Sequence, residues 1–231
     1  ALLGIASGVL KREGQVFESP HGPAMVMAHP AYVLRNKDHL KKWRTLFDKV
    51  ASYLRPKPAV PHNYTLLHAK EDIEAVLVSL GPVVAFDYET EGLTPWNHKV
   101  KSVAVSDGVG KAWCFDPSLT VGAWRAFLTS QRGLIAHCAS FEGIFSLWHY
   151  GVWPSFHWDT QLGAKMEDEN QSLHLKDLAL IHTDLGAYGG EVASIIDTPE
   201  WKDVPIERIC VSNSKDADAT FRLFEYQKDL V

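Results

Sequence analysis

The stretch VVAFDYETEGL, residues 83–93, constrains the fold more than any other part of the sequence. It is an apolar run that ends in Asp87 and Glu89 and continues into Gly92 and Leu93. Side chains alternate along a strand, so residues i and i+2 lie on the same face. Two carboxylates on one face repel each other unless a positive charge lies between them. The pattern predicts either a strand that runs out into solvent or a metal site, and this stretch alone leaves both open.

The composition is that of a packed globular chain. Of the 231 residues, 46% are hydrophobic and eight are tryptophan, which argues against disorder. No run is long and apolar enough to span a bilayer, and the N-terminus shows no signal peptide. We therefore expect no membrane association and a cytoplasmic location, in a bacterium or a phage-infected host. The three cysteines are Cys114, Cys138 and Cys210. They are odd in number and widely spaced, and the sequence contains no CxxC or HExxH motif. This favours reduced, mostly buried thiols over a disulfide or a zinc site.

Charge and proline content divide the chain near residue 60. Residues 1–61 carry ten lysines and arginines against four acids, a net charge of +6, whereas residues 62–231 carry thirteen against twenty-four, or −11. The basic excess in residues 35–44 is typical of a solvated helix face, with a phosphate-contacting edge as the alternative. The segment RPKPAVP, residues 55–61, contains three prolines, which predicts a linker. We expect an N-terminal region over residues 1–55, a linker over 56–61 and a main domain over 62–231.

Hydrophobic periodicity in the main domain alternates between the periods of strands and helices. This order predicts an α/β fold, a mixed sheet flanked by helices. The expected strands are 64–68, 83–88, 99–107, 111–116 and 133–137, and the expected helices are 37–54, 69–81, 122–130, 139–151, 159–169, 173–182 and 204–230.

Four carboxylates lie where elements of this order can converge. Asp87 and Glu89 lie on the first main strand, Glu142 lies in the first turn of a helix, and Asp216 lies inside the last helix. Charged residues in apolar segments are seldom buried unless they are paired or coordinate a metal. Mg²⁺ and Mn²⁺ take oxygen ligands, and two such ions can stabilise both the attacking and the leaving oxygen of a phosphodiester.

Three motifs of the chain resemble a known family. FDYETEGL (86–93), AHCASFEG (136–143) and SKDADATFRL (214–223) are similar to the three motifs of the DEDD 3′–5′ exonuclease domains of the RNase-H-like superfamily. The connecting segments 158–170 and 173–179 resemble the branch attached to family A DNA polymerases. The resemblance implies an RNase-H-like fold. It also implies hydrolysis at the single-stranded 3′ end of DNA, releasing 5′-mononucleotides, as proofreading for a polymerase domain in cis or in trans.

The same resemblance implies roles for individual residues. The four carboxylates would be catalytic and would hold two Mg²⁺ or Mn²⁺ ions. Three further residues would contact the 3′-terminal nucleotide: Thr90, Leu93 and Phe141.

The chain departs from the family pattern in three places. Glu142 and Cys138 stand where the family usually has Asp and Asn. The family also has Tyr four residues, or His five residues, before the last acid, to position the attacking water. This chain has Ser212 and Val211 at those positions, so Ser212 is the remaining catalytic candidate for that role. Ser212 faces the right way but is shorter than a phenol, and a register that uses Asp218 instead does not supply the missing group. The alternative function is therefore a weak or inactive exonuclease-fold module that binds DNA.

The N-terminal region carries a second resemblance. Residues 2–36 are similar to the C-terminal third of the uracil-DNA glycosylase superfamily, in which 2–10 would start a strand and helix and His29 would approach a flipped uracil. The earlier motifs of that superfamily are absent, so we expect no glycosylase activity unless a longer N-terminal sequence contains them. Some phage DNA polymerases carry a similar region before their exonuclease. We therefore expect a piece of such a protein, with a polymerase region after Val231.

Overall fold

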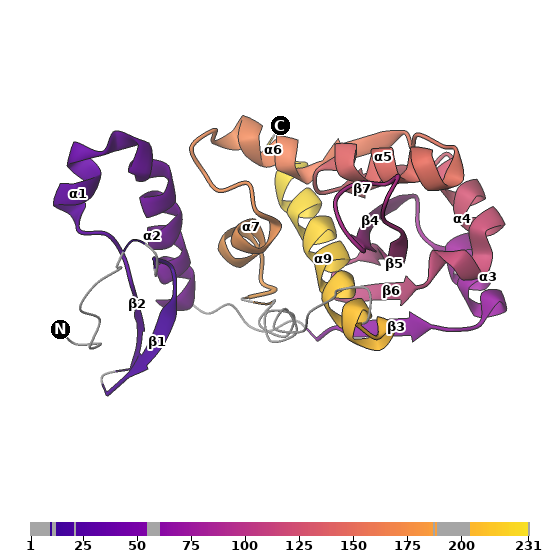
Figure 1. Ribbon diagram of the computed structural model, residues 1–231, viewed down its shortest axis with the longest axis horizontal. Helices are drawn as coiled ribbons and strands as arrows, with labels where there is room; N and C mark the ends of the chain where they lie inside the picture. The colour runs from indigo at the N-terminus through magenta and orange to yellow at the C-terminus, as the bar shows by residue number, and fades with distance from the viewer. Residues whose placement is uncertain are drawn as a thin grey trace.

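The computed structural model describes residues 10, 13–20, 22–54, 61–186, 188 and 204–230. Figure 1 shows a small N-terminal region beside a larger α/β body. Among the described residues, no helix has both the length and the apolar character that crossing a bilayer requires.

A mixed six-stranded sheet forms the centre of the larger body. The order of its strands is β3-β6-β5-β4-β7-β8. The pairs β3–β6, β4–β7 and β7–β8 are parallel, and β5 runs antiparallel to both of its neighbours. The strands are β3 (Asn63–Leu67), β4 (Val83–Thr90), β5 (Val100–Gly108), β6 (Lys111–Phe115), β7 (Gly133–Ala136) and β8 (Phe156–Asp159).

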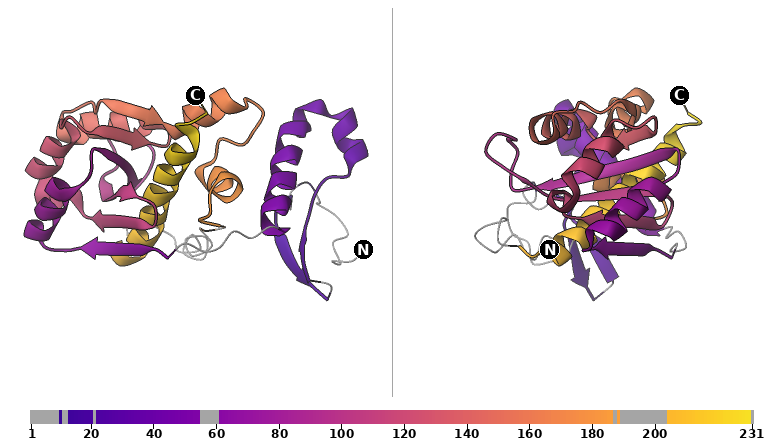
Figure 2. Two further views of the ribbon diagram at one scale, coloured as in Figure 1. Left: turned by 180° about the vertical axis from the view of Figure 1, so that it is seen from behind. Right: turned by 90° about the vertical axis from the view of Figure 1, so that its right-hand side faces the viewer.

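Helices cover both faces of this sheet. Three of them pack on one face, around a buried aromatic core that includes Phe86, Trp124 and Phe145. A long helix crosses the other face, with one shorter helix on its far side from the sheet and another over its C-terminal end, as the views in Figures 1 and 2 agree. The first three are α3 (Lys70–Ser79), α4 (Val121–Leu128) and α5 (Ala139–Tyr150), the long helix is α9 (Ile206–Gln227), and the two shorter ones are α6 (Thr160–Glu167) and α7 (Leu175–His182); a short 3-10 turn, η3 (Pro117–Thr120), precedes α4.

Strand alternation in β4 determines where the acids point. Phe86 and Tyr88 belong to the aromatic core beneath α3, α4 and α5. Ala85 packs with residues of α9 on the opposite face. Because side chains alternate, Asp87 and Glu89 lie on the same face as Ala85, the face that α9 crosses.

Small residues allow α9 to lie close to the sheet. Ala104 and Cys114 of the sheet pack directly against Cys210 and Ala217 of the helix. Cys114 and Cys210 form a disulfide, with their Cα atoms 5.5 Å apart. The expectation of reduced cysteines was wrong for these two residues, because the close packing of α9 brings together residues that are 96 positions apart in sequence. Cys138 is a free cysteine.

The N-terminal region combines an antiparallel hairpin with helices. The carboxylate of Glu13 organises it, accepting hydrogen bonds from the Ala28 N–H at 2.8 Å and from His39, and pairing with Lys42 at 3.2 Å. Lys49 reaches Asp177 of α7 at 2.5 Å. Lys42 and Lys49, both in the helix Leu40–Leu54, thus form ion pairs within the protein. The elements are β1 (Val16–Ser19), β2 (Gly22–Met25), α1 (Pro30–Arg35), η2 (Lys37–His39) and α2 (Leu40–Leu54).

The secondary structure expected from periodicity is largely confirmed, with ends shifted by a few residues. The strand β8 and the hairpin β1–β2 were missed, because these four-residue strands give little alternation and lack the continuous apolar run that marks the equally short β7. Residues 2–9, where a strand and helix start were expected, lie outside the described residues.

Candidate active site

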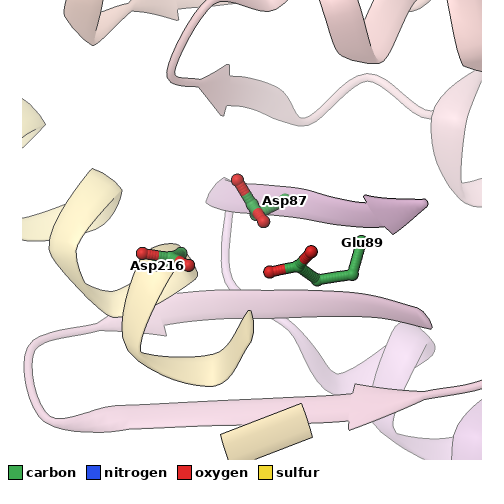
Figure 3. A group of neighbouring side chains, drawn as sticks. All are labelled: Asp87, Glu89 and Asp216. Atoms are coloured by element: carbon green, nitrogen blue, oxygen red, sulfur yellow. The ribbon is translucent and has the colours of Figure 1, made fainter. Parts of the chain in front are cut away.

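Three carboxylates from two elements meet above the sheet. Asp87 and Glu89 project from β4, and Asp216 projects from α9 toward them, as Figure 3 shows. One ligand atom from each of the three residues lies within 4.8 Å of the others. Asp216 thus joins Asp87 and Glu89 in a single acidic group, although it lies 127 or more positions from them in sequence.

Asp218, the alternative to Asp216 in the third motif, does not belong to this group. Its carboxylate accepts the Tyr64 hydroxyl at 2.7 Å and the Gly110 N–H at 2.9 Å. Arg222 donates to both of its oxygens, each at 3.0 Å. Asp218 is thus fully buried in an ion-pair network, while Asp216 faces β4.

Glu142 approaches the group from the first turn of α5. Its side chain is 2% exposed, and its Oε2 has no hydrogen-bond partner. Cys138 precedes the helix in the left-handed region, with φ 69°, and so turns the chain from β7 into α5. Glu142 does not belong to the group of three, but it lines the same cavity.

This cavity has a volume of about 600 Å³. Five of the eight predicted site residues line it, whereas Thr90, Leu93 and Ser212 are not among its described lining residues. All four acids and Phe141 line it. The other lining residues are Tyr88, His137, Cys138, His174, Leu175 and Lys176.

Burial raises the pKa values of all four carboxyl groups, and repulsion by neighbouring acids of the site adds to the shift for Asp87 and Glu89. Burial raises the pKa of Asp87 well above its usual value, and the charges of Asp216, Glu142 and Glu89 add to the shift. Burial and then the charge of Asp216 raise the pKa of Glu89 to about 7. Burial raises the pKa of Asp216 to about 6, opposed by Lys176 and by the Tyr188 hydrogen bond.

Glu142 follows the same rule. Burial raises its pKa well above the usual value, and backbone hydrogen bonds, including that from Tyr88, oppose the shift. Buried carboxylates that repel one another, one of them with an oxygen that lacks a partner, form a favourable site for a hard divalent cation. The donor set therefore fits a hard divalent cation.

Of the three predicted substrate-contacting residues, Phe141 lines this cavity, whereas Thr90 and Leu93 lie on or beside the β4–β5 loop. Phe141 is half-buried and packs on Phe145, with 4.8 Å between ring centroids. Leu93 is 82% exposed on the β4–β5 loop. The Thr90 hydroxyl donates to the Gly92 carbonyl at 2.7 Å and so shapes that loop.

Ser212 lies one helical turn before Asp216 but does not reach the cavity. Its side chain is 3% exposed, and it is not among the described residues that line the cavity. The catalytic role predicted for Ser212, orienting the attacking water, stays a prediction. Its place on α9 brings it near Asp216 along the helix, but its side chain does not line the cavity.

Sequence reasoning missed several polar residues of the site, and three of them act directly on the acids or on the helix that carries Glu142. Lys176 lines the cavity and favours the ionised forms of Asp87, Glu89 and Asp216. The other two are Asp159, which binds the start of α5, and Tyr188, which donates to Asp216. Lys176 lies in a segment already matched to the family, so its charge was the available signal; Tyr188 offers no such signal, because its partner is 28 positions away.

Comparisons with known proteins agree with this geometry. The fold is the RNase-H-like exonuclease fold, a six-stranded mixed sheet flanked by helices. The sequence model described as 3′–5′ exonuclease matches residues 64–230. The chain belongs to this 3′–5′ exonuclease family. No curated protein sequence matches the chain.

Solved structures share this fold at low sequence identity. Brucella melitensis NrnC with bound Mg²⁺ superposes with a TM-score of 0.53 at 17% identity, over 74% of this chain and 81% of that one. Escherichia coli RNase D, an exoribonuclease, has a TM-score of 0.58 at 17% identity, over 72% and 46%. The POL domain of Pol1 from M. smegmatis has a TM-score of 0.50 at 16% identity, over 73% and 28%. At such identities the likeness establishes the fold alone.

Proposed function

We propose that this chain is a metal-dependent 3′–5′ exonuclease that removes 5′-mononucleotides from the single-stranded 3′ end of DNA. The observation that carries the proposal is the convergence of Asp87, Glu89 and Asp216 within 4.8 Å in a cavity that Glu142 also lines. Membership of the 3′–5′ exonuclease family supports the same reaction.

In this proposal the four acids hold two divalent cations, Mg²⁺ or Mn²⁺. When bound, such ions stabilise the charge that develops on the phosphate and lower the pKa of water. The acids contribute orientation, because β4 and α9 are both fixed by the buried core. Lys176, which lines the same cavity, contacts the phosphate of the substrate and offsets part of its negative charge.

The nucleotide to be removed is held by apolar contact. Phe141, on the cavity wall, packs on the terminal base or sugar, and Leu93 closes over it from the β4–β5 loop. Such contacts tolerate any base, because every base has an apolar face. That tolerance suits an exonuclease that must act on any sequence.

Two exposed tryptophans lie on the β4–β5 loop and on α5, which also carry Leu93 and Phe141. Trp96 of the β4–β5 loop and Trp148 of α5 are 61% and 60% exposed, and their ring centroids lie 6.3 Å apart. Trp148 follows Glu142 by six residues on one helix, a distance of roughly 9 Å at 1.5 Å per residue. We place the preceding nucleotides of the single strand against this pair.

The assignment to DNA, to proofreading and to a polymerase partner rests on the motif resemblance to the polymerase-linked branch. The structural relatives include ribonucleases, so RNA is the competing substrate. A weak or inactive module that binds DNA is the alternative function, and it is favoured by one observation: Ser212 is buried and does not line the cavity.

For the N-terminal region we propose a structural role. We propose boundaries at 1–55, 56–61 and 62–231, with the first part derived from a glycosylase-like domain. His29, the residue expected near a flipped base, accepts a hydrogen bond from the Ala31 N–H at 3.1 Å and so caps α1. A capping role needs no nucleic acid.

The testing experiment uses 5′-labelled single-stranded DNA and RNA of one sequence, with Mg²⁺ and then Mn²⁺, beside Asp87→Ala. We expect a ladder of products shortened from the 3′ end on DNA, absent with the variant. Shortening of RNA alone would make the chain an exoribonuclease. Intact substrates under both metals, with DNA binding retained, would support the inactive module.

A further inference from the structure

Two aspartates of α9, two residues apart, each accept a hydrogen bond from a tyrosine outside that helix. The Tyr188 hydroxyl donates to Oδ1 of Asp216 at 2.9 Å. The Tyr64 hydroxyl donates to Oδ2 of Asp218 at 2.7 Å. The two contacts are alike in chemistry but differ in their surroundings.

At Asp218 the tyrosine is one of several donors. Arg222 and the Gly110 N–H already hold both oxygens of that carboxylate, so the loss of one phenol leaves it fixed. Asp216 instead faces the acids of β4 across the cavity. A hydrogen bond to one of its oxygens limits rotation of the carboxylate and leaves the lone pairs of the other oxygen for a cation.

The ring of Tyr188 is itself held in place. The ammonium nitrogen of Lys176 lies 5.7 Å from its centroid, within the range of a cation–π contact. Lys176 also lines the cavity. The Tyr188 side chain thus contacts both the Lys176 ammonium group, through its ring, and the Asp216 carboxylate, through its hydroxyl.

We propose that Tyr188 is a positioning residue of the exonuclease site, whose hydroxyl holds the Asp216 carboxylate in the orientation that faces Asp87 and Glu89. The inference rests on the proposed function. The phenol that contacts Asp216, the acid of the third motif, comes from Tyr188, which lies outside α9. Ser212, which lies on α9, is buried and does not line the cavity. Partners that orient a metal ligand typically change metal affinity 10- to 100-fold when they are removed.

The experiment compares Tyr188→Phe with Tyr64→Phe in the full chain. Both variants remove one hydroxyl from a tyrosine bonded to an aspartate of α9, and only the first aspartate belongs to the acidic group. We measure Mn²⁺ affinity by titration calorimetry, thermal unfolding, and kcat and KM on single-stranded DNA. For Tyr188→Phe we expect Mn²⁺ affinity to fall about 10- to 100-fold, with a lower kcat and a KM within about twofold.

Tyr64→Phe should bind Mn²⁺ as the unaltered chain does, even if its unfolding temperature falls. Equal Mn²⁺ affinity in Tyr188→Phe and the unaltered chain would overturn the inference, and so would an equal loss in both variants. If the unaltered chain degrades DNA and Tyr188→Phe matches it in both constants, the positioning role is wrong and the proposed function stands. If the unaltered chain binds no Mn²⁺, both are wrong.

Discussion

The carboxylate of Asp159 binds the N–H of Ala139 at 2.9 Å, and so ties the start of α5 to the start of α6. Its other oxygen accepts the N–H groups of Gln161 at 2.8 Å and Leu162 at 3.2 Å, as the N-cap of α6. The Cys138 N–H also donates to Asp159, at 3.2 Å. One side chain thus satisfies N–H groups at two helix ends, and one of these helices carries Glu142.

Asp159→Ala should both destabilise the protein and impair the site. The loss of an N-cap costs about 0.5–2 kcal/mol, and two helix ends are affected, so we expect roughly 1–3 kcal/mol by urea unfolding. We also expect a lower kcat, because Glu142 lies in the loosened turn. The matched control is Asp116→Ala. It removes the carboxylate that caps η3 by accepting the Ser118 N–H at 2.8 Å, and Asp116 does not line the cavity. It should lose stability but keep kcat; a kcat loss equal to that of Asp159→Ala would contradict the argument.

Cys138→Asn should stabilise the chain. Cys138 has φ 69°, a left-handed conformation that costs a non-glycine residue roughly 1–2 kcal/mol, and asparagine adopts it far more readily. We expect a gain of about 0.5–1 kcal/mol in the free energy of unfolding. Ser140→Asn, in the helix two residues later, should give no gain. A gain at position 140 and none at 138 would show that backbone conformation is not the cause.

The acidic residues in and around the site show what the sequence can predict and what it cannot. Alternation along β4 predicts that Asp87 and Glu89 share a face, because that rule is local. The choice between Asp216 and Asp218 depends on how α9 is rotated against the sheet, which distant partners such as Tyr64 and Arg222 decide. Capping of α5 by Asp159 links residues 20 positions apart, and no local pattern reports it.

Glu89→Gln should stabilise the metal-free protein at neutral and alkaline pH while abolishing activity. The pKa of Glu89 is raised to about 7 in the folded state, so the folded protein binds a proton that the unfolded chain has released. The stability that this proton contributes is present below about pH 4.3 and is lost as the pH rises through 7.

By removing this loss, Glu89→Gln should gain roughly 1–3 kcal/mol at pH 8 in a chelator, and little at pH 4. Urea unfolding at the two pH values measures it. Glu71→Gln, an exposed acid in the first turn of α3, is the control and should change stability by only a few tenths of a kcal/mol at either pH. A pH-independent gain in Glu89→Gln would rule out the titration of this carboxyl as the cause.

Reduction of the Cys114–Cys210 disulfide should lower stability without preventing folding. A cross-link between residues 96 positions apart restricts the unfolded chain, an effect of typically 2–4 kcal/mol. We expect such a loss by urea unfolding in dithiothreitol. Thiol titration of the denatured protein should find one free thiol, Cys138, before reduction and three after it. Cys138→Ser should leave the effect of reduction unchanged, and three thiols without reductant would show that the bond does not form in solution.

Trp148→Ala should weaken the binding of long substrates but not of a dinucleotide. The roughly 9 Å between Glu142 and Trp148 along α5 corresponds to between two and three stacked nucleotides at about 3.4 Å each, beyond the reach of a dinucleotide. Loss of one stacking contact costs about 1–2 kcal/mol, so KM on a ten-nucleotide strand should rise about 5- to 30-fold. On the dinucleotide, KM should stay within about twofold. Leu147→Ala, equally on α5 and 51% exposed, is the control, and an equal rise there or on the dinucleotide would place the strand elsewhere.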